Sequence, residues 1–443
     1  VFSPQAISFF IILNLIFFIY TLFVIFKKKT SMNRFIEVKD FSDKLPEIKI
    51  SSMKTKWLLG LILGFSLITR VVWLGIPKNE YFDEVYHAFT ARRILHNDPK
   101  AWEWWNTPPE GFAYEWTHPP LAKLGMVLGM KIFGENSFGW RFPQAVLGTG
   151  TVFLIYLLAK KIFKDELTGI ISSAIFALDG LPLVMSRIGM NETYLLFFVL
   201  LTVYFFLKEK NFLSAVSFGL ALASKWSAIW TIPIFFLICL RRKRKFNLSI
   251  LWFLLLPFTI YLLTYLPMFL SGHGLDIFWG MQKQMWWYHT GLRATHAYSS
   301  SWWSWPLLFR PVWLFTEGVG NSVRNIYAMG NPVVFWFGLA SVVPCFIYSY
   351  LEKNKNLAFV IFAYLIFFVP WAVSPRILFF YHYLPSIPFL AIATGFVLRR
   401  FPKLVTIYLL LATVLFIYFY PHWTGISVPL WLDNSYYWLS TWK

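Results

Sequence analysis

The stretch 404–421, LVTIYLLLATVLFIYFYP, decides what kind of fold this chain has. It contains no charged residue, and its length suits the hydrocarbon core of a bilayer, which a helix of about 20 apolar residues crosses. Arg399, Arg400 and Lys403 stand directly before it, and basic residues gather at the cytoplasmic ends of membrane helices. The stretch therefore predicts a transmembrane helix.

Similar apolar runs recur along the 443 residues. We expect spans at 6–26, 57–77, 144–162, 167–187, 193–208, 211–224, 228–240, 248–270, 332–350, 357–373, 378–398 and 404–421. Only 14% of the residues are charged, whereas a soluble domain has about 25%. The sequence thus predicts an all-α integral membrane protein with 11–12 transmembrane helices. The run 6–26 is interpreted as a retained span, because it lacks a basic start and a small-residue cleavage site.

The distribution of charge orients these spans. More than half of the 40 lysines and arginines lie in short loops on one side, which the positive-inside rule makes cytoplasmic. Two long segments, 78–143 and 271–331, then lie outside. The expected units are an N-terminal span with a cytoplasmic connector (1–56), a transmembrane domain (57–421) and an outer tail (422–443).

The net charge of +19 does not indicate a nucleic-acid partner. The basic residues form short clusters at the ends of apolar runs, which is a signal of membrane topology and not of one basic face. Cys239 and Cys345 both lie in predicted spans. They predict small core residues and no disulfide framework.

Two adjacent carboxylates, Asp83 and Glu84, follow the second predicted span among aromatic residues. Burial at a membrane boundary raises the pKa of a carboxylate, which suits a general base or a metal ligand. A solvated acidic turn with aromatic anchors is the competing interpretation. This stretch alone leaves both open.

Isolated polar and charged residues stand at the same outer boundary. The set comprises His118, Arg141, Arg187, Glu192, Lys225, His296, Arg310 and Arg376. Each cation has a structural alternative, since arginine and lysine also anchor a chain to lipid headgroups. Lys123 and Lys131 lie on an amphipathic stretch that would rest on the outer membrane surface. Asp179, inside a predicted span, needs a partner such as Arg187, because an intramembrane charge costs several kcal/mol.

The second outer segment is rich in tryptophan beside hydroxyl groups. Trp302, Trp303 and Trp305 follow His296 and three serines. Aromatic rings next to hydroxyl partners suit a sugar site, and interfacial anchoring is the alternative. Cations, carboxylates and aromatic rings at one membrane boundary fit a substrate that is both lipid and anion, such as a polyprenyl phosphate. No glycine-rich nucleotide loop and no His/Cys zinc spacing is present.

These residues, in this order, resemble the protein O-mannosyltransferase family over about 57–421. The motifs that carry the resemblance are Phe82-Asp83-Glu84-Val85, His118-Pro119-Pro120-Leu121-Ala122-Lys123, Trp140-Arg141, Asp179-Gly180, Ser186-Arg187, Lys225-Trp226, His296-Ala297-Tyr298-Ser299-Ser300, Trp305-Pro306 and Tyr381-His382-Tyr383. The resemblance implies a GT-C glycosyltransferase fold, whose two large outer loops carry short amphipathic helices. It implies inverting transfer of a hexose, mannose, from a polyprenyl-phosphate donor to Ser or Thr of proteins, outside the cell membrane.

The resemblance also implies roles for individual residues. Asp83 would be the general base, with Glu84 in support. Arg141 would hold the donor phosphate, with Lys225, Arg376 and Arg187 as further phosphate ligands. The sugar and acceptor residues would be His118, Glu192, His296, Tyr298, Trp305 and His382.

Other expectations concern cofactors and partners. A divalent cation, Mg²⁺ or Mn²⁺, held by Asp83, Glu84 and Glu192 is an option that some relatives of this fold suggest. The expected partners are the lipid-linked sugar, an acceptor protein or peptide and membrane lipids, and dimeric relatives make a dimer an option.

Departures from the family pattern leave rivals open. The chain lacks the large soluble insert of eukaryotic members, which fits a bacterial form, and it carries Glu192 and Ala297 where relatives tend to have Asp and Pro. One rival is a GT-C enzyme that modifies a lipid or glycan, such as an aminoarabinose transferase acting on lipid A. Others are a lipid or solute transporter, disfavoured because no inverted repeat is evident, and a non-catalytic subunit, disfavoured by the intact Asp83 and Glu84.

Overall fold

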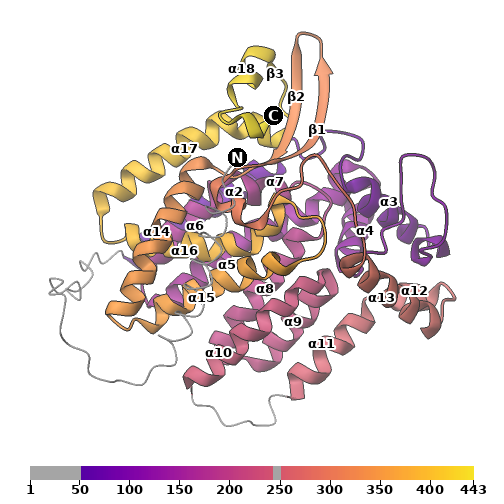
Figure 1. Cartoon of the computed structure of the whole chain (residues 1–443), viewed down its shortest axis with the longest axis horizontal. Helices are drawn as coiled ribbons and strands as arrows, with labels where there is room; N and C mark the ends of the chain where they lie inside the picture. Colours follow the sequence, from indigo (N-terminus) through magenta and orange to yellow (C-terminus); the bar gives the residue numbers. More distant parts are fainter. Residues whose placement is uncertain (1–50, 243–250) are drawn as a thin grey trace.

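The computed structural model describes residues 51–242 and 251–443, and the chain forms a bundle of helices (Figure 1). Five helical segments in these residues are long and apolar enough to cross a membrane. They are α5 (Ser137–Phe163), α14 (Pro332–Leu351), α15 (Lys355–Phe368) continued by η5 (Val369–Val373), η6 (Phe380–Ser386) continued by α16 (Ile387–Leu398), and α17 (Pro402–Thr424).

Further helices complete the bundle and correspond to the other expected spans. They are α2 (Ser52–Val71), α6 (Glu166–Ala177), α7 (Gly180–Met185), α8 (Glu192–Leu207), α9 (Asn211–Ser224), η2 (Trp226–Thr231), α10 (Ile232–Arg242) and α11 (Leu251–Leu263). The expected span 6–26 and most of its connector lie outside the described residues.

Several expected spans differ from the structure. The span 57–77 ends at Val71, and the span 248–270 is divided into α11 and a separate short helix, α12 (Leu266–Leu270). The span 167–187 is interrupted at Asp179, which separates α6 from α7. The Asp179 carboxylate accepts a hydrogen bond of 2.8 Å from the backbone N–H of Asn331 at the start of α14, so the break ties two distant segments together. The span expected at 144–162 begins at Ser137, so Arg141 lies inside α5 and not ahead of it.

The surface of the bundle is apolar where lipid would cover it. On α17, Leu404, Ile407, Leu410, Val414 and Ile417 are exposed at 49–67%. A water-soluble monomer rarely exposes so continuous an apolar strip. The strip follows one face of the helix, and the opposite face packs on the bundle core. A helix with this division is stable in a bilayer.

Both long outer segments are folded. The first carries α3 (Glu84–Leu95), η1 (Pro99–Trp102) and α4 (Leu121–Phe133). The second carries α13 (Leu275–Thr290), η4 (Trp302–Leu307) and the antiparallel hairpin of β1 (Val312–Val319) and β2 (Ser322–Ala328). The short helices were expected, whereas the hairpin was not.

The chain's C-terminal part packs against this hairpin. β3 (Val428–Pro429) pairs with β2 in the order β1-β2-β3 and is followed by α18 (Leu430–Ser435) and η7 (Ser440–Trp442). Trp442 is buried and its indole N–H donates a 2.6 Å hydrogen bond to the carbonyl of Leu308. The tail therefore helps to fix the second outer segment.

The apolar core has two parts. The larger one fills the bundle, and a second one packs α3 and α4 against α13, with Trp102, Met126, Tyr265 and Phe278 among its buried residues. Figure 1 shows α3, α4, α12 and α13 gathered at one side of the bundle, away from α14–α17. The two outer segments thus share a core of their own at the edge of the bundle.

Candidate active site

A cavity of about 570 Å³ lies where the two outer segments meet the bundle. Segments far apart in the sequence form its wall: the start of α3, the loop before α4, the start of α8, the residue after α9, and the loops around α13 and η6. Most of the predicted site residues line it, namely Asp83, His118, Glu192, Lys225, His296, Arg376 and His382.

Asp83 stands directly before α3 and makes no capping hydrogen bond with that helix. The preceding residue, Phe82, has a left-handed backbone with φ 51°, a conformation that is strained for a bulky side chain and recurs at functional sites. The turn leaves the Asp83 carboxylate on the cavity wall.

The surroundings of Asp83 favour its protonated form. Burial and the negative charge of Glu192 raise the pKa of Asp83 to about 7, although Lys225 and Arg376 act in the opposite direction. A carboxylate with a pKa near neutrality is a stronger base than an exposed one and is still ionised in a useful fraction. Asp83 therefore has the properties of a general base.

Glu84, its neighbour, has a different environment. It is fully buried and forms a two-point ion pair with Arg141, at 2.7 Å to Nε and 2.6 Å to Nη2. Its Oε1 also accepts a hydrogen bond of 2.7 Å from the backbone N–H of Gly189. Glu84 does not line the cavity, so the pair Asp83–Glu84 divides into one residue at the site and one in the scaffold.

Arg141 and Arg187, expected at the donor phosphate, serve as scaffold in this structure. Arg141 is fully buried, and its other donors bind the carbonyls of Leu74, Pro77 and Asn79. Arg187 binds carbonyls at the end of α2, from Thr69 to Trp73. All five N–H donors of Arg141 are occupied, so Arg141 has no donor left for a phosphate. The Nη1 group of Arg187 is likewise taken up by backbone carbonyls.

Lys225 and Arg376 do reach the cavity. The Lys225 ammonium lies 2.7 Å from Glu192 Oε1. Arg376 lies over the ring of Tyr288 and hydrogen-bonds His289 Nδ1 at 2.6 Å. Its Nε is buried without a hydrogen-bond partner among the described residues. Arg376 itself lines the cavity, and a guanidinium at such a wall is well suited to an anionic oxygen.

The remaining predicted residues differ in their positions. His296 lines the cavity and also a second hollow of about 700 Å³ formed by residues 294–297, 299–301 and 376–378. Tyr298 and Trp305 line neither hollow in the described part of the chain. Tyr298 lies under Arg310, and Trp305 is buried behind His382, with ring centroids 6.2 Å apart. These two aromatic residues therefore support the wall and do not form it.

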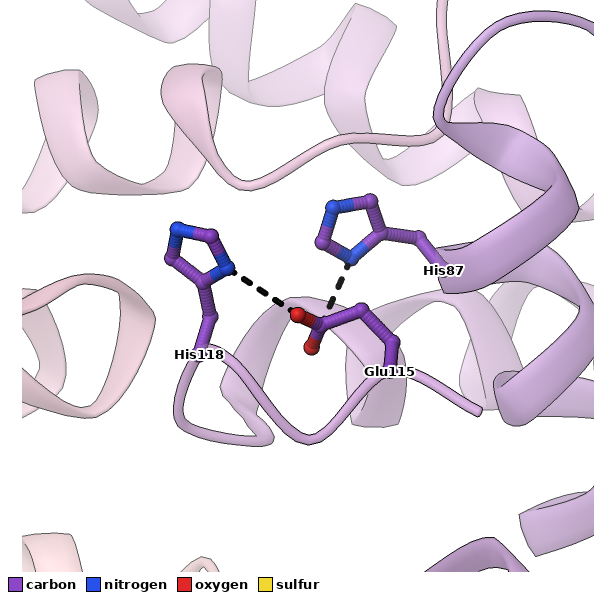
Figure 2. A group of neighbouring side chains, drawn as sticks. All are labelled: His87, Glu115 and His118. Carbon is purple, nitrogen blue, oxygen red and sulfur yellow. Dashed lines mark hydrogen bonds and ion pairs between the residues drawn. The ribbon is translucent and has the colours of Figure 1, made fainter. Parts of the chain in front are cut away.

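A further cluster was missed by the sequence interpretation. Figure 2 shows His87, Glu115 and His118 on the cavity wall, with both imidazoles turned toward the Glu115 carboxylate. Lys123, expected on a membrane-facing surface, is buried and donates to the same carboxylate and to two backbone carbonyls. Glu115 stands three residues before His118 among aromatic residues, and this isolated acidic residue was the available signal.

Burial and charge set the protonation of this cluster. Burial lowers the pKa of His87 and of His118, although Glu115 opposes the effect, so both rings are neutral. Burial would raise the pKa of Glu115, but Lys123 and the histidines hold it well below its usual range. The cluster therefore consists of one carboxylate, one ammonium and two neutral imidazoles.

Comparison with known proteins agrees with this architecture. Residues 117–269 match the family model described as "Dolichyl-phosphate-mannose-protein mannosyltransferase", and residues 274–442 match the "C-terminal four TMM region of protein-O-mannosyltransferase". Together the two models cover most of the chain. The chain belongs to the protein O-mannosyltransferase family.

Curated members of the protein O-mannosyltransferase family align along nearly the whole chain. The polyprenol-phosphate-mannose--protein mannosyltransferase of Mycobacterium tuberculosis is 24% identical, over 87% of this chain and 92% of its own length. The expected resemblance to this family over most of the chain is thus confirmed.

Solved structures share the fold. The Saccharomyces cerevisiae protein O-mannosyltransferase Pmt1–Pmt2 complex bound to the sugar donor aligns with a TM-score of 0.75 and 16% identity, over 89% of this chain and 93% of that chain. ArnT from Cupriavidus metallidurans bound to undecaprenyl phosphate aligns with a TM-score of 0.59 and 16% identity, over 81% and 63%. The predicted GT-C fold is confirmed.

Proposed function

We propose that this protein transfers mannose from a polyprenyl-phosphate donor to Ser or Thr hydroxyls of proteins at the extracytoplasmic face of the cell membrane. Family membership and the names of its curated relatives support a mannosyltransferase. The observation that carries the proposal is the cavity in which Asp83 meets two cations, Lys225 and Arg376, at the edge of a membrane bundle.

The arrangement suits a single displacement with inversion. The acceptor oxygen forms a bond to the anomeric carbon while the bond from that carbon to the phosphate oxygen breaks. The acceptor hydroxyl gives its proton to the Asp83 carboxylate. The lipid phosphate leaves with the electron pair of the broken bond. A positioned base of this kind contributes about 10²–10⁴-fold in rate.

Arg376 is the first candidate for the leaving phosphate. Arg376 lines the cavity, and its contacts with Tyr288 and His289 hold the guanidinium in place at the wall. Positive charge that is already in place when phosphate charge develops lowers the barrier without reorganisation. Lys225 is a second cation on the same wall, although it is paired with Glu192. Glu192, His118, His296 and His382 are then the candidates for sugar and acceptor hydroxyls.

The acceptor has an entrance beside the donor. The second hollow, lined by residues 294–297, 299–301 and 376–378, shares His296 and Arg376 with the main cavity. Three serines, Ser299, Ser300 and Ser301, are part of its lining. A peptide in this hollow would bring a hydroxyl toward Asp83, which favours a protein acceptor over a lipid.

The test is sugar transfer by the purified protein in detergent. Synthetic polyprenyl-phosphate mannose and a Ser/Thr-rich peptide are the substrates, with Asp83→Asn as the matched variant. Mannosylated peptide from the wild type and none from Asp83→Asn would support the proposal. Transfer to a lipid A acceptor but not to any peptide would overturn it in favour of the aminoarabinose-type activity. Equal turnover by both forms would remove Asp83 from the mechanism.

A further inference from the structure

We propose that His87, Glu115 and His118 bind a divalent transition-metal ion of the zinc class at the wall of the cavity. The inference concerns a site that differs from the one expected on the sequence, where Asp83, Glu84 and Glu192 were the metal candidates. Glu84 is committed to Arg141, so that set of carboxylates is not available together. The binding test below does not depend on the transferase activity.

The three side chains converge on one point. One donor atom from each lies within 4.8 Å of the others. His118 Nδ1 is 3.0 Å from Glu115 Oε1, and His87 Nδ1 is 3.9 Å from Glu115 Oε2. Figure 2 shows the two rings on either side of the carboxylate, both presenting Nδ1 to it. Zinc binds imidazole nitrogen and carboxylate oxygen at about 2.0–2.2 Å, so small side-chain rotations suffice to enclose an ion.

An independent observation points to a missing ligand. His87 is 4% exposed, and its Nδ1 is buried without a hydrogen-bond partner among the described residues. A buried polar nitrogen left unpaired costs about 1–3 kcal/mol, and its 3.9 Å distance from Glu115 is too long for a hydrogen bond. Coordination of an ion between this nitrogen and the carboxylate would remove the penalty.

The elements that carry the ligands are fixed in place. His87 lies in the first turn of α3, whose Ala88 and Ala91 are fully buried against α4. The loop with Glu115 and His118 is held by Lys123, whose ammonium donates to the carbonyls of both residues at 3.0 Å. These contacts place the ligands before any ion arrives, which lowers the entropic cost of binding.

The charge of Lys123 decides which ion fits. Lys123 also donates to Glu115 Oε2, so it offsets the carboxylate charge that a hard cation would need. Mg²⁺ and Ca²⁺ depend on several oxygen ligands. Zinc and cobalt gain most of their affinity from neutral imidazole, of which this site has two.

Three protein ligands leave one coordination position open. His87, Glu115 and His118 all line the cavity, so the fourth position faces its interior. Sites with three ligands and an open position hold water or a substrate oxygen. At this place the ion would orient a hydroxyl of a bound substrate near Asp83.

Metal content and ligand geometry test the proposal directly. Tag-free protein in detergent is stripped with a chelator, incubated with Zn²⁺ or Co²⁺ and passed through gel filtration. We expect stoichiometric retention by the wild type and visible ligand-field absorption of the Co²⁺ form typical of nitrogen and oxygen ligands. His87→Ala and His118→Ala should each abolish both signals. His96→Ala is the matched control, because His96 is an exposed histidine at the end of the same helix and should retain them.

A second measurement protects the test against misfolded variants. X-ray absorption at the zinc edge of the wild type should show two imidazole ligands in the first coordination shell. Failure of folded wild-type protein to retain either ion would overturn the proposal. Retention that survives in folded His87→Ala and His118→Ala would overturn it as well.

Discussion

Glu84 and Arg141 form a fully buried, two-point ion pair, with 2.7 Å between Oε1 and Nε and 2.6 Å between Oε2 and Nη2. The pair links the start of α3 to α5, and the N–H of Gly189 adds the loop between α7 and α8. Asp83, the adjacent residue, is thereby held at the junction of three segments. The ion pair of Glu84 with Arg141 therefore holds Asp83, the proposed base, in a fixed position.

This ion pair predicts that Glu84→Gln lowers the stability of the fold and leaves the sugar-transfer step itself intact. Loss of one partner leaves Arg141 buried and unpaired, which costs about 3–5 kcal/mol. The melting temperature in detergent should fall markedly, and activity per folded molecule should change far less. Glu110→Gln, at an exposed loop residue, is the control. A Glu84→Gln protein with an unchanged melting temperature and no turnover would instead make Glu84 a catalytic residue.

The pH dependence of the reaction should report Asp83. A base acts in its ionised form, and the pKa of Asp83 is raised to about 7 by burial and by Glu192. We therefore expect kcat/KM for the free enzyme to rise as the pH increases toward about 7 and to level off above it. A profile that is flat between pH 5 and 8 would contradict this assignment.

Substitution of Lys225 offers a second test of whether Asp83 is the group that titrates in the pH profile. Its charge lowers the pKa of Asp83, so Lys225→Met should move the acidic limb of the profile to higher pH. The double variant Lys225→Met with Glu192→Gln removes both opposing charges and should return the limb toward its original position. An unmoved limb in the single variant would show that a different group titrates.

Asp83→Asn should make the fold more stable at alkaline pH. The folded-state pKa of Asp83, about 7, lies above the unfolded value of about 3.9. The stability associated with its protonated form is therefore complete below about pH 4 and is lost as the pH rises to about 7. Asn does not titrate, so the melting temperature of the variant should exceed that of the wild type at pH 8 and match it near pH 4. A lower melting temperature at pH 8 would contradict the burial of this charge.

Arg376→Gln should weaken donor binding. A hydrogen bond to a charged group contributes about 1.5–3 kcal/mol, which corresponds to a rise of about 10–100-fold in KM for the lipid-linked sugar. Arg293→Gln is the control, because Arg293 is exposed and binds only the carbonyl of Pro375 at 2.7 Å among the described residues. Equal KM values for both variants would move the phosphate to Lys225.

The sequence predicts the bundle well because apolar length and flanking charge are local properties. α8, α9 and α14 begin and end within two residues of the expected spans. Local sequence properties do not predict the break at Asp179. It depends on a hydrogen bond that the backbone N–H of Asn331, far away in the sequence, donates to the Asp179 carboxylate. The hairpin β1–β2 lies in an outer segment, where apolar length and flanking charge give no guide to strands.

In the site, too, the sequence predicts what is local and not what depends on the fold. Residue type and membrane side identify Asp83, Lys225 and Arg376, which do line one cavity. They do not separate an arginine that binds substrate from one that binds backbone, as Arg141 and Arg187 show. Only the count of hydrogen-bond donors in the folded protein distinguishes them. The His87–Glu115–His118 cluster likewise comes from a fold-dependent approach of α3 to the loop before α4.

The composition of the cavity wall also has a consequence for biosynthesis. Asp83 is translated early, whereas Arg376, Tyr381 and His382 belong to the last helices to enter the membrane. A nascent chain that has inserted only its first helices therefore holds Asp83 without Arg376 and without the part of the wall that Tyr381 and His382 form. If Asp83 and Arg376 act as proposed, the ribosome-bound intermediate would not consume lipid-linked sugar before these late residues are in place.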